Sequence, residues 1–453
     1  MSGPNRFLVI GGGPAGSTAA AVAAAGGARV TLVECEVVGG ACQLRDCIPS
    51  KALVASANTL AAMRAGGHFG RTDPGPLRPD VSRLAERRLS VASLLSASLI
   101  GRLEALGVTL ETGRACFAGP GTVALSSASG ERTVEFDDAL IATGSRPRVP
   151  AWAEVDGELV LTSRQAYGLA GSPEHVVIIG AGSTGVEFAH IFSSLGGRVT
   201  LLTAGERVLP GHDEEAAAAL EEEFAERGVA VLRGARACSA HRRGIGVEVI
   251  TEDGRVVGGS HVLLAVGLQP ACEGLGLGAA GVAVEGEAIR VDACQRTSVP
   301  HIYAAGDVTG GVMLSSVAAA EGSVVGRLVL GEEAAPVDPQ QAAQTVFTEP
   351  DIAWVGLQEA EAAAAGRRVR VARLAFSTNP QALIQPRPRG FVKILSDPRD
   401  DRVLGGTVVG RHAAELIGIL ALAVRAGLAR SMVADTLMAY PSLAATVAAA
   451  AAR

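Results

Sequence analysis

The sequence lacks any apolar run long enough to cross a membrane. Its longest apolar stretches, residues 18–28 and 417–424, are broken or short beside the roughly 20 residues of a spanning helix, although the mean hydropathy is +0.31. No basic segment precedes the first apolar residues, so we expect no secretory signal and a cytoplasmic protein. Positive charge is not in excess either. The 40 basic and 46 acidic residues give a net charge of −6, so we expect no nucleic acid and no membrane as a partner.

Lysine and aromatic residues are also scarce. Only two of the 40 basic residues are lysines, Lys51 and Lys393, and the 3% of aromatic residues include three tyrosines, Tyr167, Tyr303 and Tyr440. An interchangeable surface cation in such a chain would be arginine, so each remaining lysine or tyrosine marks a position to examine. The seven cysteines are ordinary for 453 residues and do not indicate a secreted disulfide framework.

Two segments share one pattern of apolar strand, glycine turn, Ala-rich helix and second strand. The first begins at Phe7 and ends with the strand 29–33, and the other begins at Val176 and ends with the strand 198–202. Both turns have the spacing G-x-G-x-x-G, and their glycines are Gly11, Gly13, Gly16, Gly180, Gly182 and Gly185. Glycine there allows a tight turn and brings a pyrophosphate close to the backbone at a helix N-terminus. The two units predict two dinucleotide-binding sites.

The residue that ends the second strand of each unit bears on which nucleotide binds. Glu34 holds this place in the first unit, where a carboxylate accepts hydrogen bonds from both ribose hydroxyl groups. The second unit has Thr203 there, followed by Arg207. Thr203 neither grips a ribose diol nor repels a 2′-phosphate, and Arg207 is either a surface residue or the partner of such a phosphate. NADH or NADPH stays open, with NADPH slightly favoured.

Two cysteines follow the first unit in the segment Cys42-Gln-Leu-Arg-Asp-Cys47-Ile-Pro-Ser-Lys51. Zinc sites generally use cysteine pairs in twos, and the sequence has no second pair, so we predict no metal site. Residues five apart on an ideal helix are rotated by about 140°, so a disulfide between these cysteines requires a distorted turn. The segment resembles the redox-active stretch of the flavoprotein disulfide reductases, which include lipoamide dehydrogenase, glutathione reductase and mercuric reductase.

The resemblance extends over nearly the whole chain. The segment 141–147, with Thr143 and Gly144, resembles the crossover from the FAD domain to the NAD(P)H domain, and 264–270 resembles the return crossover. By the same resemblance, Thr143 and Gly144 belong to the cofactor-binding residues.

Two later motifs complete the likeness. The segment 302–307 is similar to the family's second FAD motif, in which Asp307 meets the ribityl–pyrophosphate region, and 345–353 resembles the start of its dimerisation domain. The resemblance implies an α/β protein with two Rossmann-like dinucleotide-binding domains, for FAD and NAD(P)H, and a C-terminal α+β dimerisation domain that forms a homodimer.

The expected domains follow from these motifs. They are an FAD-binding domain over 1–150, an NAD(P)H-binding domain over 151–270, a central part of the FAD domain over 271–338 and a dimerisation domain over 339–453. In the last of these the sequence predicts strands over 346–355, 390–395 and 403–409 and helices over 413–426 and 431–438.

The resemblance also implies catalytic roles. Cys47 would be the thiol next to the flavin and Cys42 the thiol that exchanges with a substrate. Lys51 would lie by the flavin, paired with Glu187, which comes two residues after the last glycine of the second turn. Its placement in a chain so poor in lysine supports this role.

The chain departs from the family at two places. The family keeps a His–Glu pair near its C-terminus as the proton carrier, but this chain has Tyr440 and Ala445 at those positions. An unperturbed tyrosine titrates near pH 10 and is no general base at neutral pH, although it can donate a hydrogen bond. Asp46 stands where the family usually has glycine, and its carboxylate disfavours a thiolate at Cys47. A lipoamide-dehydrogenase-like branch of NAD(P)H:quinone reductases shares both departures but lacks the first cysteine, whereas this chain keeps Cys42.

Three interpretations remain open. The first is an FAD-dependent, NAD(P)H-linked oxidoreductase that acts on a small-molecule disulfide or dithiol through Cys42 and Cys47, with Tyr440 in place of the usual histidine. The second is an NAD(P)H:quinone or dye reductase that passes electrons directly from the flavin. The third is a non-enzymatic flavoprotein redox sensor.

Overall fold

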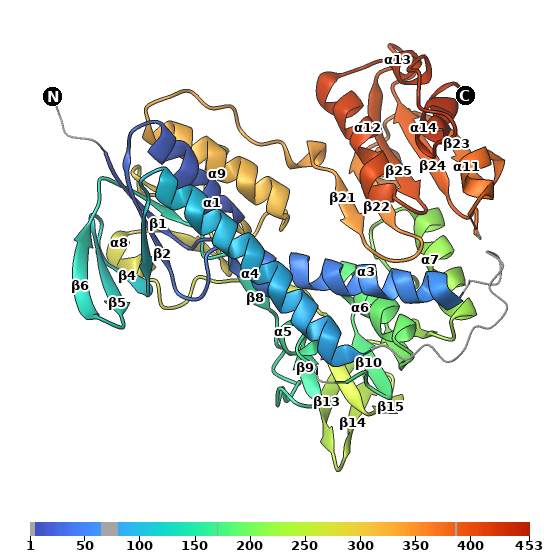
Figure 1. The fold of residues 1–453 in the computed structure, drawn as a ribbon, viewed down its shortest axis with the longest axis horizontal. Coiled ribbons are helices and arrows are strands. Elements are labelled where there is room, and N and C mark those ends of the chain that lie inside the picture. The colour runs from blue at the N-terminus through green and yellow to red at the C-terminus, as the bar shows by residue number, and fades with distance from the viewer. Residues whose placement is uncertain (1–4, 65–79, 170, 386) are drawn as a thin grey trace. The chain divides into compact units, whose positions relative to one another are not determined.

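The computed structural model describes residues 5–64, 80–169, 171–385 and 387–453 (Figure 1). They fall into two compact units. Unit 1 draws on the ranges Met1–Ser50, Glu86–Arg148 and Leu268–Pro339, and unit 2 on Lys51–Ala85, Val149–Gly267 and Gln340–Arg453. The chain passes between the units within the helices α3 (Cys47–Arg64) and α4 (Val81–Ala105), and again at residues 148–149, 267–268 and 339–340. The division into three domains over four segments that we expect from the sequence stays a prediction.

Unit 1 is built on a five-stranded parallel sheet. In spatial order its strands are β20 (Ile302–Ala304), β7 (Asp138–Ile141), β1 (Arg6–Ile10), β2 (Arg29–Glu34) and β3 (Thr109–Thr112). The central strand β1 is apolar and buried from Phe7 to Ile10, as expected of a parallel strand covered on both faces.

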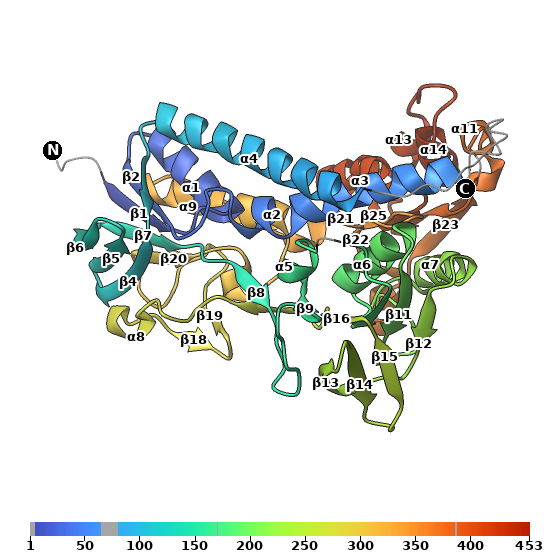
Figure 2. The same ribbon diagram turned by 60° about the horizontal axis from the view of Figure 1, so that its bottom comes forward.

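Two helices of unit 1, α1 (Pro14–Ala25) and α9 (Ser315–Val329), lie side by side, as Figure 2 also shows. Glycine allows this close approach, since a Cβ atom on Gly322 would lie 2.1 Å from the carbonyl oxygen of Ala15. The Ala-rich composition of α1 is therefore a packing requirement: small residues let the two backbones meet.

Smaller elements complete unit 1. They are α2 (Gly40–Leu44), β4 (Arg114–Gly119), β5 (Thr122–Ser127), β6 (Gly130–Glu135), β8 (Ser145–Pro147), β17 (Leu268–Pro270), α8 (Leu277–Ala280), β18 (Val284–Glu285), β19 (Ala288–Ile289) and the short 3-10 helix η2 (Asp307–Thr309). The strands β4, β5 and β6 form an antiparallel sheet, and β8 pairs with β17.

Unit 2 contains a second five-stranded parallel sheet. Its strands, in spatial order, are β12 (Ala230–Leu232), β11 (Arg198–Leu202), β10 (His175–Ile179), β16 (His261–Leu264) and β9 (Val160–Thr162). Its other elements are α5 (Ser163–Ala166), α6 (Ser183–Ser194), α7 (Glu214–Glu226) and an antiparallel sheet of β13 (Ala237–Arg243), β14 (Gly246–Thr251) and β15 (Val256–Gly259).

The C-terminal part of unit 2 is an antiparallel sheet packed against helices. Its strands, in spatial order, are β21 (Gln344–Val346), β22 (Ile352–Gly356), β25 (Val403–Val409), β24 (Phe391–Ser396) and β23 (Arg370–Ala375). Its helices are α10 (Glu359–Ala364), α11 (Pro380–Leu383), α12 (Ala413–Ala426), α13 (Arg430–Ala434) and α14 (Ala444–Ala451). Two parallel sheets, each with a glycine-turn βαβ unit, and this α+β part confirm the predicted fold class.

Two predicted elements differ from the structure. The strand expected over 346–355 is two strands, because Pro350 has no N–H group to continue a ladder. The helix expected over 431–438 ends at Ala434, and Leu437 beyond it is 98% exposed, with no apolar surface to hold a further turn.

Candidate active site

The first glycine turn connects β1 to α1 and has no room for a side chain at its first and third glycines. Gly11 has φ +106°, and a Cβ atom there would lie 2.3 Å from the carbonyl oxygen of Ala142. A Cβ atom on Gly16 would lie 1.9 Å from the carbonyl oxygen of Gly11. Gly13, which caps the helix, has open space at its Cβ position. The start of α1 is thus open at its backbone, as a bound pyrophosphate requires.

Glu34 ends β2 and turns its carboxylate toward this glycine loop. One oxygen accepts a hydrogen bond from the backbone N–H of Gly12 at 2.7 Å and the other from the N–H of Glu36 at 2.8 Å. Two backbone donors therefore fix the carboxylate beside the turn.

The predicted residues Thr143, Gly144 and Asp307 belong to the same edge of the unit 1 sheet. Thr143 and Gly144 follow β7, and Asp307 follows β20, so both groups lie at the carboxyl ends of parallel strands, as the glycine turn does. The Ser145 hydroxyl donates to the Asp307 carboxylate at 2.6 Å, and burial raises the pKa of Asp307. Ligands of open α/β sheets bind at this edge.

The second glycine turn repeats the first. Gly180 has φ +105°, and its Cβ atom would lie 2.3 Å from the carbonyl oxygen of Ala265. A Cβ atom on Gly185 would lie 1.8 Å from the carbonyl oxygen of Gly180, while Gly182 has open space. Unit 2 therefore offers the same exposed backbone at the start of α6.

The residues after β11 differ from those after β2. The Thr203 hydroxyl accepts a hydrogen bond from the N–H of Gly205 and donates to the carbonyl of Arg207, and Thr203 is only 3% exposed. Its hydroxyl group is thus used within its own turn. Arg207 and Arg233, which follow the adjacent strands β11 and β12, both pair with the buried carboxylate of Glu221, at 3.0 and 2.7 Å.

The cysteine segment is not one continuous helix. Cys42 lies in α2 and Cys47 begins α3, and the break at residues 45–46 supplies the distortion that a disulfide requires. Both cysteines are present as thiols. The Ser315 hydroxyl lies 3.2 Å from the Cys42 sulfur, to which it donates, and 3.3 Å from the Cys47 sulfur. The neighbouring Cys47 thiol, followed by burial, raises the pKa of Cys42.

A cavity of about 260 Å³ in unit 1 gives access to one of these thiols. Cys42 is among the residues that line it, together with Ser17 and Arg102, and Cys47 is not. Of the two cysteines, Cys42 therefore borders this cavity, although both residues are partly exposed.

Lys51 and Glu187 are brought together within unit 2. The Lys51 ammonium lies 3.1 and 3.0 Å from the two carboxylate oxygens of Glu187 and 4.6 Å from the ring centre of Phe347. The N–H of Phe347 donates to the same carboxylate at 3.1 Å. The ammonium is thus held by an ion pair while its side chain stays 34% exposed.

Tyr440 lies in the segment between α13 and α14 and is 80% exposed. The side-chain amide of Asn379 donates to the carbonyl of Ser442 and to the Thr446 hydroxyl, which holds this segment against η4 (Phe376–Thr378). The phenol is therefore presented at the surface of unit 2.

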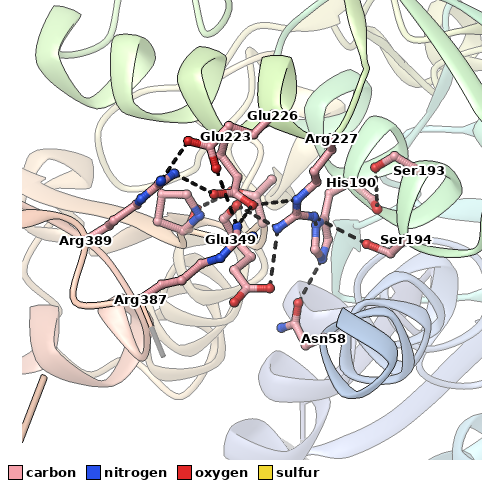
Figure 3. A network of polar contacts seen from close by, with 12 residues as sticks. Asn58, His190, Ser193, Ser194, Glu223, Glu226, Arg227, Glu349, Arg387 and Arg389 are labelled. Carbon is pink, nitrogen blue, oxygen red and sulfur yellow. Dashed lines mark hydrogen bonds and ion pairs between the residues drawn. The ribbon is translucent and has the colours of Figure 1, made fainter. Parts of the chain in front are cut away.

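A buried ionic network in unit 2 was not expected from the sequence (Figure 3). The Glu223 carboxylate, 2% exposed, accepts hydrogen bonds from Arg227 at 2.7 Å, Arg387 at 2.6 Å and Arg389 at 3.2 Å. Arg227 also donates to Nδ1 of His190 at 2.8 Å, so the other ring nitrogen, 2.8 Å from Asn58, carries the proton of a neutral imidazole. Burial lowers the pKa of His190 to about 3.

The comparisons with known proteins cover nearly the whole chain. Residues 5–322 match the family described as "Pyridine nucleotide-disulphide oxidoreductase", and residues 342–451 match its dimerisation domain. The chain belongs to this family.

Named relatives fall into two groups. The chain is 39% identical over 460 residues to a Mycobacterium tuberculosis protein named "NAD(P)H dehydrogenase (quinone)", covering 99% of this chain and 93% of that protein. It is 35% identical over 444 residues to a "Dihydrolipoyl dehydrogenase" of Chlorobaculum tepidum, covering 97% and 94%. The names of these relatives thus point to two different substrates, a quinone for the first and a dihydrolipoyl group for the second.

Solved structures show the same fold. LpdA from Mycobacterium tuberculosis superimposes with a TM-score of 0.93 at 38% identity and 99% coverage of both chains. The HOCl-induced flavoprotein disulfide reductase RclA from Escherichia coli superimposes with a TM-score of 0.87 at 28% identity and 98% coverage of both chains. This chain is an FAD-dependent NAD(P)H oxidoreductase of the flavoprotein disulfide reductase family, and its dimerisation domain supports a homodimer.

The described part of this oxidoreductase has neither a metal-binding cluster nor a membrane-spanning helix. Among residues 5–64, 80–169, 171–385 and 387–453, no group of three or more His, Cys, Asp or Glu side chains could hold a metal ion. In the same part of the chain, no helix is both long and apolar enough to span a membrane.

Sequence reasoning missed several residues of this oxidoreductase. Ser315, Ser145 and Glu221 contact predicted site residues, and they lie 273, 162 and 14 positions from Cys42, Asp307 and Arg207. A lone serine gives no motif, and only the fold shows which side chain meets which.

Proposed function

We propose that this protein is an NAD(P)H-linked oxidoreductase that acts on a small-molecule disulfide or dithiol through Cys42 and Cys47. The observation that carries the proposal is the cysteine pair itself: both sulfurs share the Ser315 hydroxyl, and one of them lines a cavity of about 260 Å³. A reductase that passes electrons straight from the flavin has no need of such a pair.

The cysteines would act in a fixed order. The Cys42 thiolate attacks one sulfur of the substrate disulfide, which forms a mixed disulfide and releases the first substrate thiol. Cys47 then attacks the Cys42 sulfur, which releases the second substrate thiol and leaves a disulfide between the two cysteines. When bound, FAD would supply the two electrons that reopen this disulfide, and NAD(P)H would supply them to FAD.

The residues of unit 1 fit FAD. The open backbone at Gly13 suits a pyrophosphate, and Glu34 beside it suits a ribose diol. Asp307, Thr143 and Gly144 follow neighbouring strands at the same sheet edge and would hold the remainder of the cofactor. In unit 2, Gly180, Gly182 and Gly185 would hold the pyrophosphate of NAD(P)H.

The arginines of unit 2 support NADPH as the electron donor. Arg207 and Arg233 follow adjacent parallel strands and converge on Glu221. About half of each side chain is exposed, at 46% and 50%. Two guanidinium groups with donors left over suit a 2′-phosphate, and no carboxylate ends β11 to hold the 2′-hydroxyl of NADH.

A second candidate is an NAD(P)H:quinone reductase. It is favoured by Tyr440 at the position of the family's histidine and by the 39% identity to a protein named "NAD(P)H dehydrogenase (quinone)". A quinone takes electrons without thiol exchange, so this activity would not require the cysteine pair.

The variant Cys42→Ala/Cys47→Ala separates the two functions. The acceptor panel contains small disulfides and quinones, each assayed with NADPH and with NADH. If the protein acts on disulfides, the variant should lose turnover with the disulfide that the wild type reduces fastest. Turnover of the variant at the wild-type rate with the best acceptor in the panel would overturn the proposal. Cys116→Ala/Cys238→Ala, which replaces two exposed cysteines, is the matched control and keeps wild-type rates.

A further inference from the structure

The Ser315 hydroxyl is placed between two sulfurs. Its oxygen lies 3.2 Å from the Cys42 sulfur and 3.3 Å from the Cys47 sulfur, although Ser315 is far from both in the sequence. Ser315 is the first residue of α9, whose backbone packs closely on α1 within unit 1, so its position is set by rigid elements.

A hydroxyl group has one proton to donate and two lone pairs that accept. It can therefore donate to a thiolate and, at the same time, accept from a thiol. A cysteine pair that holds one proton has one thiolate and one thiol. A hydroxyl group between the two sulfurs can hydrogen-bond to both, whichever of the two cysteines is the thiolate.

The groups around Cys42 change its pKa in opposite directions, and the Ser315 hydroxyl is the one that favours the thiolate. The Cys47 thiol at the start of α3, burial, and the Asp46 carboxylate in the segment before α3 all raise the pKa of Cys42. The Ser315 hydroxyl, which α9 contributes, acts in the opposite direction and lowers it. The N-terminus of the 15-residue helix α9 adds a partial positive charge on the same side.

We infer that Ser315 is a proton relay between Cys42 and Cys47, which makes the exchanging thiolate without the histidine that the family uses. The inference rests on the proposed disulfide function and deepens it. In the relay, the Cys42 proton passes to the Ser315 oxygen as the Ser315 proton passes to the Cys47 sulfur. No electrons move and no other bond changes, and the thiolate has moved from Cys47 to Cys42.

The same relay serves the second half of the exchange. After the Cys42 thiolate forms the mixed disulfide, the first substrate thiolate leaves and takes up a proton. That proton comes from Cys47 through Ser315, which leaves Cys47 as the thiolate that attacks the Cys42 sulfur. The second substrate thiolate takes its proton from water, so the two thiols released carry one proton from the protein and one from solvent.

The test compares Ser315→Ala, Ser315→Val and Ser315→Thr in the reduced holoprotein. Valine and threonine have the same shape, and only threonine has the hydroxyl, so the pair separates the relay from packing. Ser316→Ala changes the next residue of the same helix, which is exposed, and is the matched control. The measurement is the rate of alkylation by iodoacetamide against pH, with Cys42 and Cys47 followed separately by peptide mass.

Removal of the hydroxyl is expected to slow alkylation of Cys42 at pH 7 by roughly tenfold and to move its pH midpoint upward. Ser315→Thr and Ser316→Ala should keep the wild-type profile. Unchanged Cys42 profiles in both Ser315→Ala and Ser315→Val would overturn the relay, and so would equal losses in Ser315→Val and Ser315→Thr. If Ser315→Ala does not fold, the valine and threonine pair decides.

The alkylation profile needs no substrate. If quinones prove to be the acceptors while the Cys42 profile still shifts, the proposed disulfide function fails and the effect of Ser315 on the thiols stands. If disulfides are reduced at an unchanged rate by Ser315→Val with an unshifted profile, the relay fails and the proposed function stands.

Discussion

In both βαβ units a methyl group on the first glycine would meet a backbone carbonyl oxygen at 2.3 Å, and the third glycine is as tightly packed. The helices that follow differ. In unit 1, α1 is Ala-rich and packs on α9 through glycine. In unit 2, α6 buries Glu187 and His190, each with a cationic partner. The same backbone turn therefore precedes two different helices. The helix α1 packs closely on a neighbouring helix, whereas α6 buries polar side chains that contact cations.

The strand ends add a second difference. Glu34 is held toward the glycine loop by two backbone N–H groups, whereas Thr203 is turned into its own loop and Arg207 and Arg233 lie nearby. We propose that the glycines of each turn hold a pyrophosphate and that the strand end determines which nucleotide binds.

The largest effect is expected from a methyl group on the third glycine of each turn. Gly16→Ala should yield protein without flavin, because the new Cβ atom would lie 1.9 Å from a carbonyl oxygen. Gly185→Ala should keep its flavin but lose roughly 10- to 100-fold in the rate of flavin reduction by NADPH. Flavin absorbance and anaerobic reduction measure the two outcomes.

The control for this comparison is Gly101→Ala, a position in α4 with open space around its Cβ atom. Loss of flavin in Gly185→Ala would show that the two turns do not serve two separate nucleotides.

The next largest effect should come from the ionic network around Glu223 in unit 2. Glu223→Gln leaves three arginines around a buried amide, and we expect it to lower the free energy of unfolding by about 3 kcal/mol. Glu222→Gln, at the exposed neighbouring position, is the matched control. Denaturant titration of the two holoproteins makes the measurement, and equal midpoints would contradict a structural role for the network.

A tenfold effect is expected at the strand end of unit 2. Arg207→Ala and Arg233→Ala should each raise the KM for NADPH roughly tenfold and leave the KM for NADH nearly unchanged, since only NADPH carries the phosphate. Arg236→Ala, whose side chain is 66% exposed and pairs with Glu252, is the control. Equal changes for the two nucleotides would remove the argument for NADPH.

The last prediction concerns pH, and its effect is spread over several pH units. The pKa of His190 is about 3 in the folded protein, so below pH 6.5 the unfolded chain binds a proton that the folded protein does not. His190 therefore lowers the free energy of unfolding as pH falls from about 6.5 to about 3, by at most ~1.4 kcal/mol per pH unit.

Asp351 changes stability in the opposite sense over part of this range, because burial raises its pKa to about 7. The measurement is therefore the difference in free energy of unfolding between the wild type and His190→Asn. This difference should shrink as the pH falls below 6.5, and a difference independent of pH would contradict the buried neutral histidine.

The sequence predicted those features that depend on local pattern. Glycine spacing located both turns, and helix 413–426 has the predicted bounds because its apolar face repeats regularly. The scarcity of lysine was also informative: Lys51 pairs with Glu187, and Lys393, 3% exposed, pairs with Asp213 at 2.7 Å.

Long-range contacts could not be predicted in this way. Ser315 meets cysteines about 270 positions away, and Glu223 meets arginines about 165 positions away, through sheet and helix packing alone. Arg233 carries no motif, and its role depends on the pairing of β12 with β11.

The central claim, that electrons pass through the Cys42–Cys47 pair, is tested most directly by counting thiols. The oxidised holoprotein is treated anaerobically with one equivalent of NADPH, then alkylated and analysed by peptide mass. The account predicts two additional alkylated residues, Cys42 and Cys47. Neither should be alkylated when a substrate disulfide is added after the NADPH and before the alkylating reagent. Reduction of the flavin with no new thiol at either cysteine would contradict it.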